Sequence, residues 1–80
     1  MGTGYQSTIN DIKYLLSVAS VQHREEFAGQ VQAVIQPEGK GFRYFDVDGT
    51  EITLAEIHRR SQIDPVIQRS VYNLWMTYAH

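Results

Sequence analysis

The sequence predicts an α+β domain in which a three-stranded antiparallel meander has helices packed on one face, in the order α-β-β-β-α-α. Three observations support this fold class. Apolar residues recur at helical spacing in both terminal thirds of the chain, side chains alternate over residues 30–36, and Asp48-Gly49 is typical of a tight hairpin turn. Eighty residues allow one hydrophobic core, so residues 7–80 are expected to form a single domain after a flexible N-terminal arm, residues 1–6.

The first helix is predicted to begin at a cap formed by Ser7 or Thr8, and Asp11 follows Thr8 by three residues, as in a capping box. Residues at intervals of three and four form its apolar face: Ile9, Ile12, Leu16 and Ala19. The pattern extends to a stop at Gly29, since glycine commonly ends helices. Because weak helix formers stand near Ser20, this segment is either one helix of about twenty residues or two shorter helices.

Three strands are predicted in the middle of the chain. Residues 30–36 alternate between apolar and polar side chains, and a turn rich in Pro and Gly follows over residues 37–41. The aromatic segment 42–47 forms the second strand. A type I′ turn at Asp48-Gly49 then leads to the third strand, residues 50–53.

A two-residue turn at this point fixes the register of the last two strands, because it pairs Val47 with Thr50. The register places three apolar side chains on one face, beneath the helices: Phe45, Val47 and Ile52. Phe42 and Tyr44 then lie on the opposite face of the second strand. There they are expected to form an exposed aromatic patch.

Two helices are predicted after the sheet. Thr53 and Glu56 match a capping box, and Asp64-Pro65 is typical of a helix start with Asp as the N-cap and Pro in the first turn. The last helix has a continuous apolar stripe: Ile67, Val71, Leu74 and Tyr78. Other apolar and aromatic residues widen this stripe around more than half of the helix. Such a helix lies either at the centre of a core or at an interface.

Composition excludes several classes of protein. The chain has no cysteine, which removes disulfides and thiolate metal sites, and we expect neither a metal nor a cofactor. A net charge of −2 disfavours a dedicated nucleic-acid binder, which clusters Lys and Arg against phosphates. No signal peptide is recognisable, and no apolar segment approaches the ~18 residues that span a bilayer. A cytoplasmic location is therefore expected.

The segment from Phe45 to Thr50 contains the pattern D-x-D-G-T. It resembles the first motif of the haloacid-dehalogenase-like phosphotransferases, and the resemblance implies Asp46 as the nucleophile and Asp48 as the general acid/base. That family also needs Mg²⁺-binding acids, a Lys and a Ser or Thr on later strands, whereas the residues after Thr50 are predicted to be helical. The preferred interpretation is a hairpin turn, and no catalytic residue is predicted. The position of Gly49 also departs from a calcium loop.

Residues 53–65 resemble the first helix and turn of a bacterial helix-turn-helix, the resemblance extends through Val71, and the DNA-binding segment would be residues 53–76. The resemblance implies that three residues face the major groove, Gln68, Arg69 and Asn73, and that Arg59 and Arg60 contact phosphate. His58 and Gln62 stand where the motif has a small residue and a glycine. A small DNA-binding regulator is therefore the alternative function. The element order also coincides with that of the double-stranded-RNA-binding domain, although neither final helix opens with the lysines used there.

The aromatic side chains of the last helix favour protein binding. Tyr72, Trp75 and Met76 belong to residue types enriched at the centres of interfaces. We expect these three residues to form a homodimer interface, with Phe42 and Tyr44 as a second patch. The leading hypothesis is a non-enzymatic binding or accessory protein that acts by protein–protein contact, of a kind common among phages and mobile elements. The scattered histidines (His23, His58 and His80) form no catalytic pattern.

Overall fold

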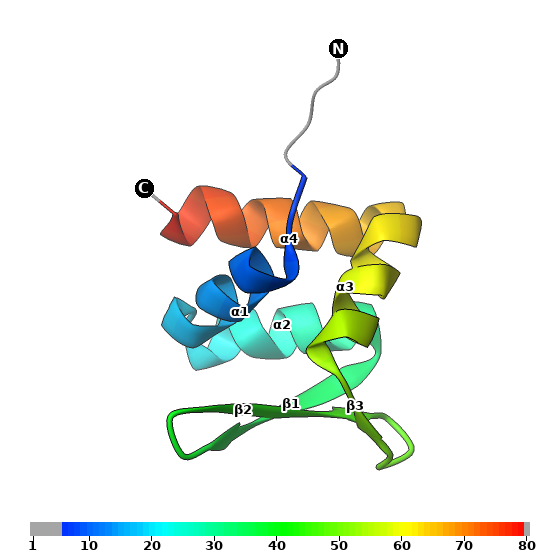
Figure 1. Ribbon diagram of the computed structural model, residues 1–80. Coiled ribbons are helices and arrows are strands. Elements are labelled where there is room, and N and C mark those ends of the chain that lie inside the picture. The colour runs from blue at the N-terminus through cyan, green and yellow to red at the C-terminus, as the bar shows by residue number, and fades with distance from the viewer. Residues whose placement is uncertain (1–5, 80) are drawn as a thin grey trace.

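All four helices lie on one side of the sheet in the computed structural model, which describes residues 6–79 (Figure 1). The elements are α1 (Ile9–Val18), α2 (Val21–Val31), β1 (Ala33–Glu38), β2 (Gly41–Asp46), β3 (Glu51–Ile52), α3 (Leu54–Ile63) and α4 (Pro65–Tyr78). The antiparallel sheet has the strand order β1-β2-β3. The α+β class and the meander with helices on one face are confirmed, but the element order is α-α-β-β-β-α-α. Most of the predicted N-terminal arm, residues 1–6, lies outside the described residues.

The chain breaks between α1 and α2 at Ala19 and Ser20, both in extended conformation. The Ser20 hydroxyl caps α2 by accepting a hydrogen bond from the His23 amide at 3.2 Å. The Ser20 amide donates to the Tyr78 hydroxyl on α4 at 2.9 Å, so a residue 58 positions away helps to hold the junction. Of the two alternatives predicted for this segment, two shorter helices is therefore the correct one.

Capping residues set the other ends of the first two helices. Thr8 and Asp11 form a complete capping box at the start of α1, as predicted. The predicted stop at Gly29 is wrong, because α2 continues to Val31, whose side chain is fully buried. Gln32 then takes the left-handed conformation, with φ 55°, and β1 begins at the next residue.

The turn between β2 and β3 encloses three residues, Val47 to Gly49, between Asp46 and Thr50, rather than the two predicted. The residues paired across these strands are Tyr44 with Ile52 and Phe45 with Glu51. The Asp46 amide donates to the Thr50 carbonyl at 2.7 Å, which closes the loop. A type I′ turn needs two successive residues of positive φ, but in this loop only Gly49 has one, at 92°. The Gly49 amide donates to the Asp46 carbonyl at 2.9 Å, so a four-residue turn over residues 46–49 ends in a left-handed glycine.

This register exchanges the two faces predicted for β2. Tyr44 and Ile52 pack against the core on the helix-facing side, together with Ile35 of β1. Phe45 alternates to the outer face, and Val47 is 69% exposed in the loop. The predicted placement of Phe45 and Val47 beneath the helices is wrong, whereas Ile52 lies where predicted.

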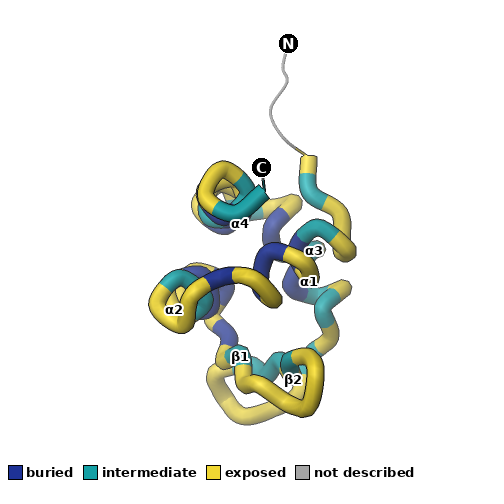
Figure 2. The backbone as a smooth tube through the Cα atoms, turned by 90° about the vertical axis from the view of Figure 1, so that its left-hand side faces the viewer, coloured by how far each residue is buried: buried dark blue, intermediate teal, exposed yellow. Residues whose placement is uncertain are grey.

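The core lies mainly among the helices. Figure 1 shows α1, α2 and α3 between the sheet and α4, and in Figure 2 the buried segments of these helices face one another. The largest fully buried side chains are Ile12, Leu15, Leu16, Phe27, Val31, Ile57, Ser61 and Val71. None of the helices within residues 6–79 is long and apolar enough to cross a bilayer.

Candidate interaction surface

Helix α4 follows α3 after a single residue, Asp64, which ends one helix and caps the next. The Asp64 carboxylate accepts a hydrogen bond from the Val66 amide at 2.9 Å, and Pro65 occupies the first turn, as predicted. One side of α4 faces the core with the predicted apolar stripe: Ile67, Val71 and Leu74 are buried, and Tyr78 is half-buried.

The opposite side of α4 is exposed and carries little charge. Tyr72 and Met76 lie one turn apart and are 42% and 55% exposed. Arg69 is the one charged residue among the 14 of α4, whereas α1, α2 and α3 each have two or three in ten or eleven. The solvent side of a helix is ordinarily polar and charged. On this side Arg69, Tyr72 and Met76, which are residue types enriched at interface centres, lie among uncharged polar residues such as Gln68 and Asn73.

Trp75 lies on the flank of α4, where it packs half-buried against the core. Of the three residues predicted for the interface on this helix, Tyr72 and Met76 therefore lie outward and Trp75 borders the core. Helical spacing is enough to predict this division, because Trp75 is four residues from Val71 and one residue from Leu74, both of them buried.

The two aromatic residues predicted as a second patch face the helices. The Arg24 guanidinium lies over the Phe42 ring, 4.9 Å from its centroid, and burial raises the pKa of the Tyr44 hydroxyl. Strand β2 and helix α4 lie at opposite ends of the molecule (Figure 1). Phe42 and Tyr44 therefore do not form one surface with the outer side of α4.

The residues named by the helix-turn-helix resemblance are spread over different environments. Arg60 donates hydrogen bonds to the Val31 carbonyl and to the Asp46 carboxylate. Arg59 donates two hydrogen bonds to the Glu56 carboxylate, at 2.9 and 2.7 Å. Gln68 and Arg69 are exposed, while Asn73 lines a groove beside α2. A helix-turn-helix joins its helices by three or four residues, whereas α3 and α4 are separated by Asp64 alone.

The two aspartates of the D-x-D-G-T segment accept hydrogen bonds from backbone amides of their own loop. Asp46 accepts hydrogen bonds from the Val47 amide at 2.8 Å and from Arg60 at 3.0 Å. The Thr50 amide donates to Asp48 at 2.9 Å, which lowers the pKa of that carboxyl. Within residues 6–79 the loop is followed by the short strand β3 and two helices, so the further strands of the phosphotransferase family do not occur there. In the same range, no cluster of three or more His, Asp or Glu residues is arranged to hold a metal ion.

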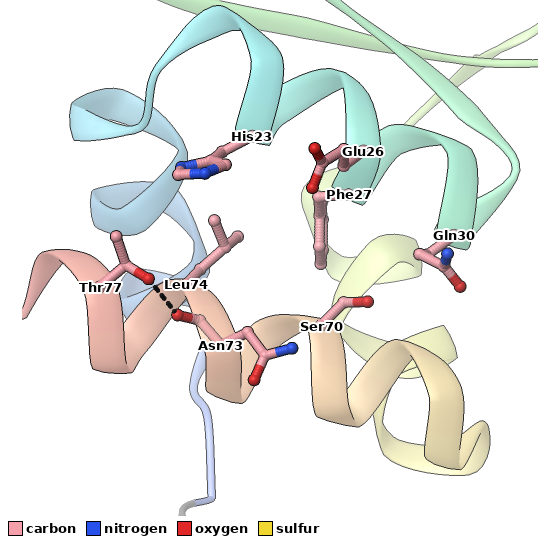
Figure 3. A pocket seen from close by; sticks show the side chains of 8 residues that line it. All are labelled: His23, Glu26, Phe27, Gln30, Ser70, Asn73, Leu74 and Thr77. Atoms are coloured by element: carbon pink, nitrogen blue, oxygen red, sulfur yellow. Dashed lines mark hydrogen bonds between the residues drawn. The ribbon is translucent and has the colours of Figure 1, made fainter.

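A groove of about 280 Å³ separates α2 from α4 (Figure 3). Its lining residues are His23, Glu26, Phe27, Gln30, Ser70, Asn73, Leu74 and Thr77. His23 Nδ1 lies 2.5 Å from the Tyr78 hydroxyl, and the Ser70 hydroxyl donates to the Val66 carbonyl at 3.2 Å. His23 and Ser70 therefore each bond to another residue, and no hydrogen bond joins these two side chains.

Comparison of the chain with protein-family models, with curated proteins and with solved structures found no match. The function therefore has to be inferred from the geometry of the chain itself.

The sequence interpretation assigned no binding role to α2 or β1. The structure places a second groove between these two elements, and Gly29 lies in its wall. A glycine inside a helix is the available signal in the sequence, but glycine also commonly ends a helix.

Proposed function

We propose that this protein is a non-enzymatic binding or accessory protein that self-associates through the outer side of α4. The observation that carries the proposal is an exposed helix face with Tyr72 and Met76 on adjacent turns and Arg69 as its one charge. The cytoplasmic location and the phage or mobile-element character expected from the sequence belong to this proposal.

A second copy of the chain suits this face because Tyr72 lies near the middle of α4, where a two-fold axis can bring two such faces together. Arg69 and Met76 stand three and four residues to either side of Tyr72. Two antiparallel helices related by a two-fold axis at Tyr72 would place each Arg69 beside Met76 of the other copy. The two Arg69 charges would then be about 12 Å apart, beyond the screening length of about 8 Å at physiological salt.

The contact is expected to be weak. A 14-residue helix is about 21 Å long, and one face of it buries less than the roughly 800 Å² per partner of a standard interface. We therefore expect a dissociation constant in the micromolar range or above.

Sedimentation equilibrium from about 10 μM to about 1 mM tests the proposal. The mass should rise from the 9.2 kDa of one chain toward twice that value. Tyr72→Asp should keep the chain monomeric at every concentration, because it places a charge at the two-fold axis. Tyr14→Asp is the matched control, since Tyr14 is an exposed tyrosine on α1, and it should leave the equilibrium unchanged. A wild-type chain that stays monomeric throughout would overturn the proposal.

A further inference from the structure

A groove of about 420 Å³ runs between α2 and the free edge of β1. Its wall on α2 is formed by Val21, Arg24, Glu25, Ala28 and Gly29, and its floor is β1 from Ala33 to Ile35. No residue of β2 lines it, so it opens on the side of β1 away from the rest of the sheet. Figure 2 shows α2 above and to the outside of β1 on that side.

The edge of β1 beside this groove offers unpaired backbone groups. A two-residue loop, Gly39-Lys40, joins β1 to β2, and Glu38 and Gly41 close it as a hydrogen-bonded pair. Hydrogen-bonded and non-bonded pairs alternate along an antiparallel ladder, so Ala33 and Ile35 direct their amides and carbonyls away from β2. Among residues 6–79, no backbone hydrogen bond from another loop or cap reaches Ala33 or Ile35.

This stretch of edge lacks the features that usually block strand addition. Residues 33–36 contain no charge, although exposed edge strands commonly carry Lys or an inward-pointing charge. Pro37 removes one outward donor, and it lies just beyond the floor of the groove. A further strand can thus pair with β1 along residues 33–35, where the groove lies, but not at Pro37.

Gly29 leaves its part of the α2 wall without a side chain that could fill the groove. It lies within α2, where glycine lowers helix stability relative to alanine. A Cβ built at this position would meet no atom within 4 Å, so nothing in the folded chain requires glycine there. Open space above Gly29 is what an added strand would need.

Arg24 supplies a charge in the same groove. Its guanidinium donates to the Ala19 carbonyl at 2.6 Å and lies over Phe42, and within residues 6–79 it pairs with no carboxylate. Because α2 and β1 are joined through Gln32 alone, Arg24 lies toward the Ile35 end of the groove and Ala28 and Gly29 lie toward the Ala33 end. An acidic side chain at the Ile35 end would meet a guanidinium that forms no ion pair within residues 6–79.

We infer that an extended peptide segment of a partner protein adds to β1 as a fourth strand in this groove. Its inward-facing side chains, two residues apart, are an apolar one against Ala28 and Gly29 and an Asp or Glu against Arg24. Backbone hydrogen bonds to Ala33 and Ile35 hold the segment, and Arg24 sets its sequence preference. This site is separate from the outer side of α4 and does not depend on self-association there.

A library of random twelve-residue peptides displayed on phage, selected against the full chain, is the first step of the test. The selected peptides should combine an apolar and an acidic residue two positions apart. When one of them is synthesised and added to the ¹⁵N-labelled protein, amide exchange at Ala33 and Ile35 should slow at least tenfold. N-methylation of the peptide amides that face β1 should abolish binding, whereas methylation of the alternate amides should not.

Variants of the groove complete the test. Gly29→Gln should block the peptide and Gly29→Ala should retain it, and both should fold because the position is open. Arg24→Gln should weaken binding at least fivefold, whereas Glu26→Gln, which neutralises an exposed charge of α2 outside this groove, should not. Neither Gly29 variant should change the sedimentation mass, and Tyr72→Asp should leave peptide binding intact, so this site and the proposed dimer can fail separately.

Three results would overturn the inference. The first is a selection that yields no peptide or shows no preference for acidic residues. The second is wild-type affinity in Gly29→Gln. The third is slow exchange at Ala33 and Ile35 in the free protein that grows with protein concentration, because it would mean that a second copy of the chain covers the edge.

Discussion

Arg60 connects three parts of the fold through one guanidinium group. It donates to the carbonyl of Val31 at the end of α2 at 2.8 Å, to Asp46 on β2 at 3.0 Å and to Glu56 on its own helix at 2.9 Å. Its side chain is 20% exposed, so water competes little for these contacts. The positive charge also lies at the C-terminal end of α2, where the helix dipole favours a cation.

We expect Arg60→Met to lower the free energy of unfolding by about 2 kcal/mol, because it leaves Asp46 and the end of α2 without their shared donor. Arg59→Met is the matched control: Arg59 pairs with Glu56 at the surface, where water screens the pair, so its loss should lower stability much less than the loss of Arg60. Urea unfolding of both variants checks this. Equal midpoints for the two variants would contradict the structural role given to Arg60.

Glu56 makes the stability of the fold depend on pH. Hydrogen bonds from Arg59 and then Arg60 lower the pKa of Glu56 from 4.5 to about 2. The folded state therefore binds this proton less readily than the unfolded chain does. The stabilisation is fully present above pH 4.5 and is lost as the pH falls toward 2.

The urea midpoint of Glu56→Gln should accordingly lie below that of the wild type at pH 7, and the difference should shrink to nothing between pH 4.5 and pH 2. Glu25→Gln serves as the control, since Glu25 is an exposed carboxylate that forms no ion pair within residues 6–79. A Glu56→Gln difference that is constant with pH would show that the carboxylate charge is not responsible.

At the scale of elements, the β2–β3 hairpin decides which side chains support the helices. A one-residue change of register moves every side chain of a strand to the other face. Asp48-Gly49 is compatible with two loops of different length, and the difference depends on whether Asp48 takes a positive φ. Periodicity could therefore predict the hairpin but not its register. The prediction that Phe42 and Tyr44 are exposed was wrong because it depended on the wrong register.

Alanine substitutions on the two sides of this loop test the register. Val47→Ala should change the free energy of unfolding by less than about 0.5 kcal/mol because Val47 is exposed. Ile52→Ala should cost about 2 kcal/mol because Ile52 packs against the core. Chemical denaturation of the two variants gives both values. A larger loss for Val47→Ala than for Ile52→Ala would restore the predicted two-residue turn.

Helix boundaries show the same limit of sequence reasoning. The cap at Thr8 and the start at Asp64 depend on neighbours within three residues, and both were predicted. The break at Ser20 is held in part by Tyr78, and α2 extends past Gly29 because Val31 is buried in the core. Local patterns predict what local contacts determine, whereas these two features depend on residues brought together by folding.

At the scale of the whole molecule, α4 and the sheet occupy opposite ends, with the other helices between them (Figure 1). The outer side of α4 followed from helical spacing, so Tyr72 and Met76 could be identified in the sequence. The groove beside β1 could not, because it needs the α2–β1 connection at Gln32 and the strand order of the sheet. Both surfaces lie on regular elements, which present them with little rearrangement.

Cysteine cross-linking tests the central claim, that two copies meet at the outer side of α4. The chain has no native cysteine, so one introduced thiol reports one position. In an antiparallel pair of helices about 8–10 Å apart, two Tyr72→Cys residues on the axis lie within disulfide range. Under mild oxidation, Tyr72→Cys should form a covalent dimer much faster than the control Tyr14→Cys. Equal rates for the two variants, or no cross-link at Tyr72→Cys, would contradict the claim.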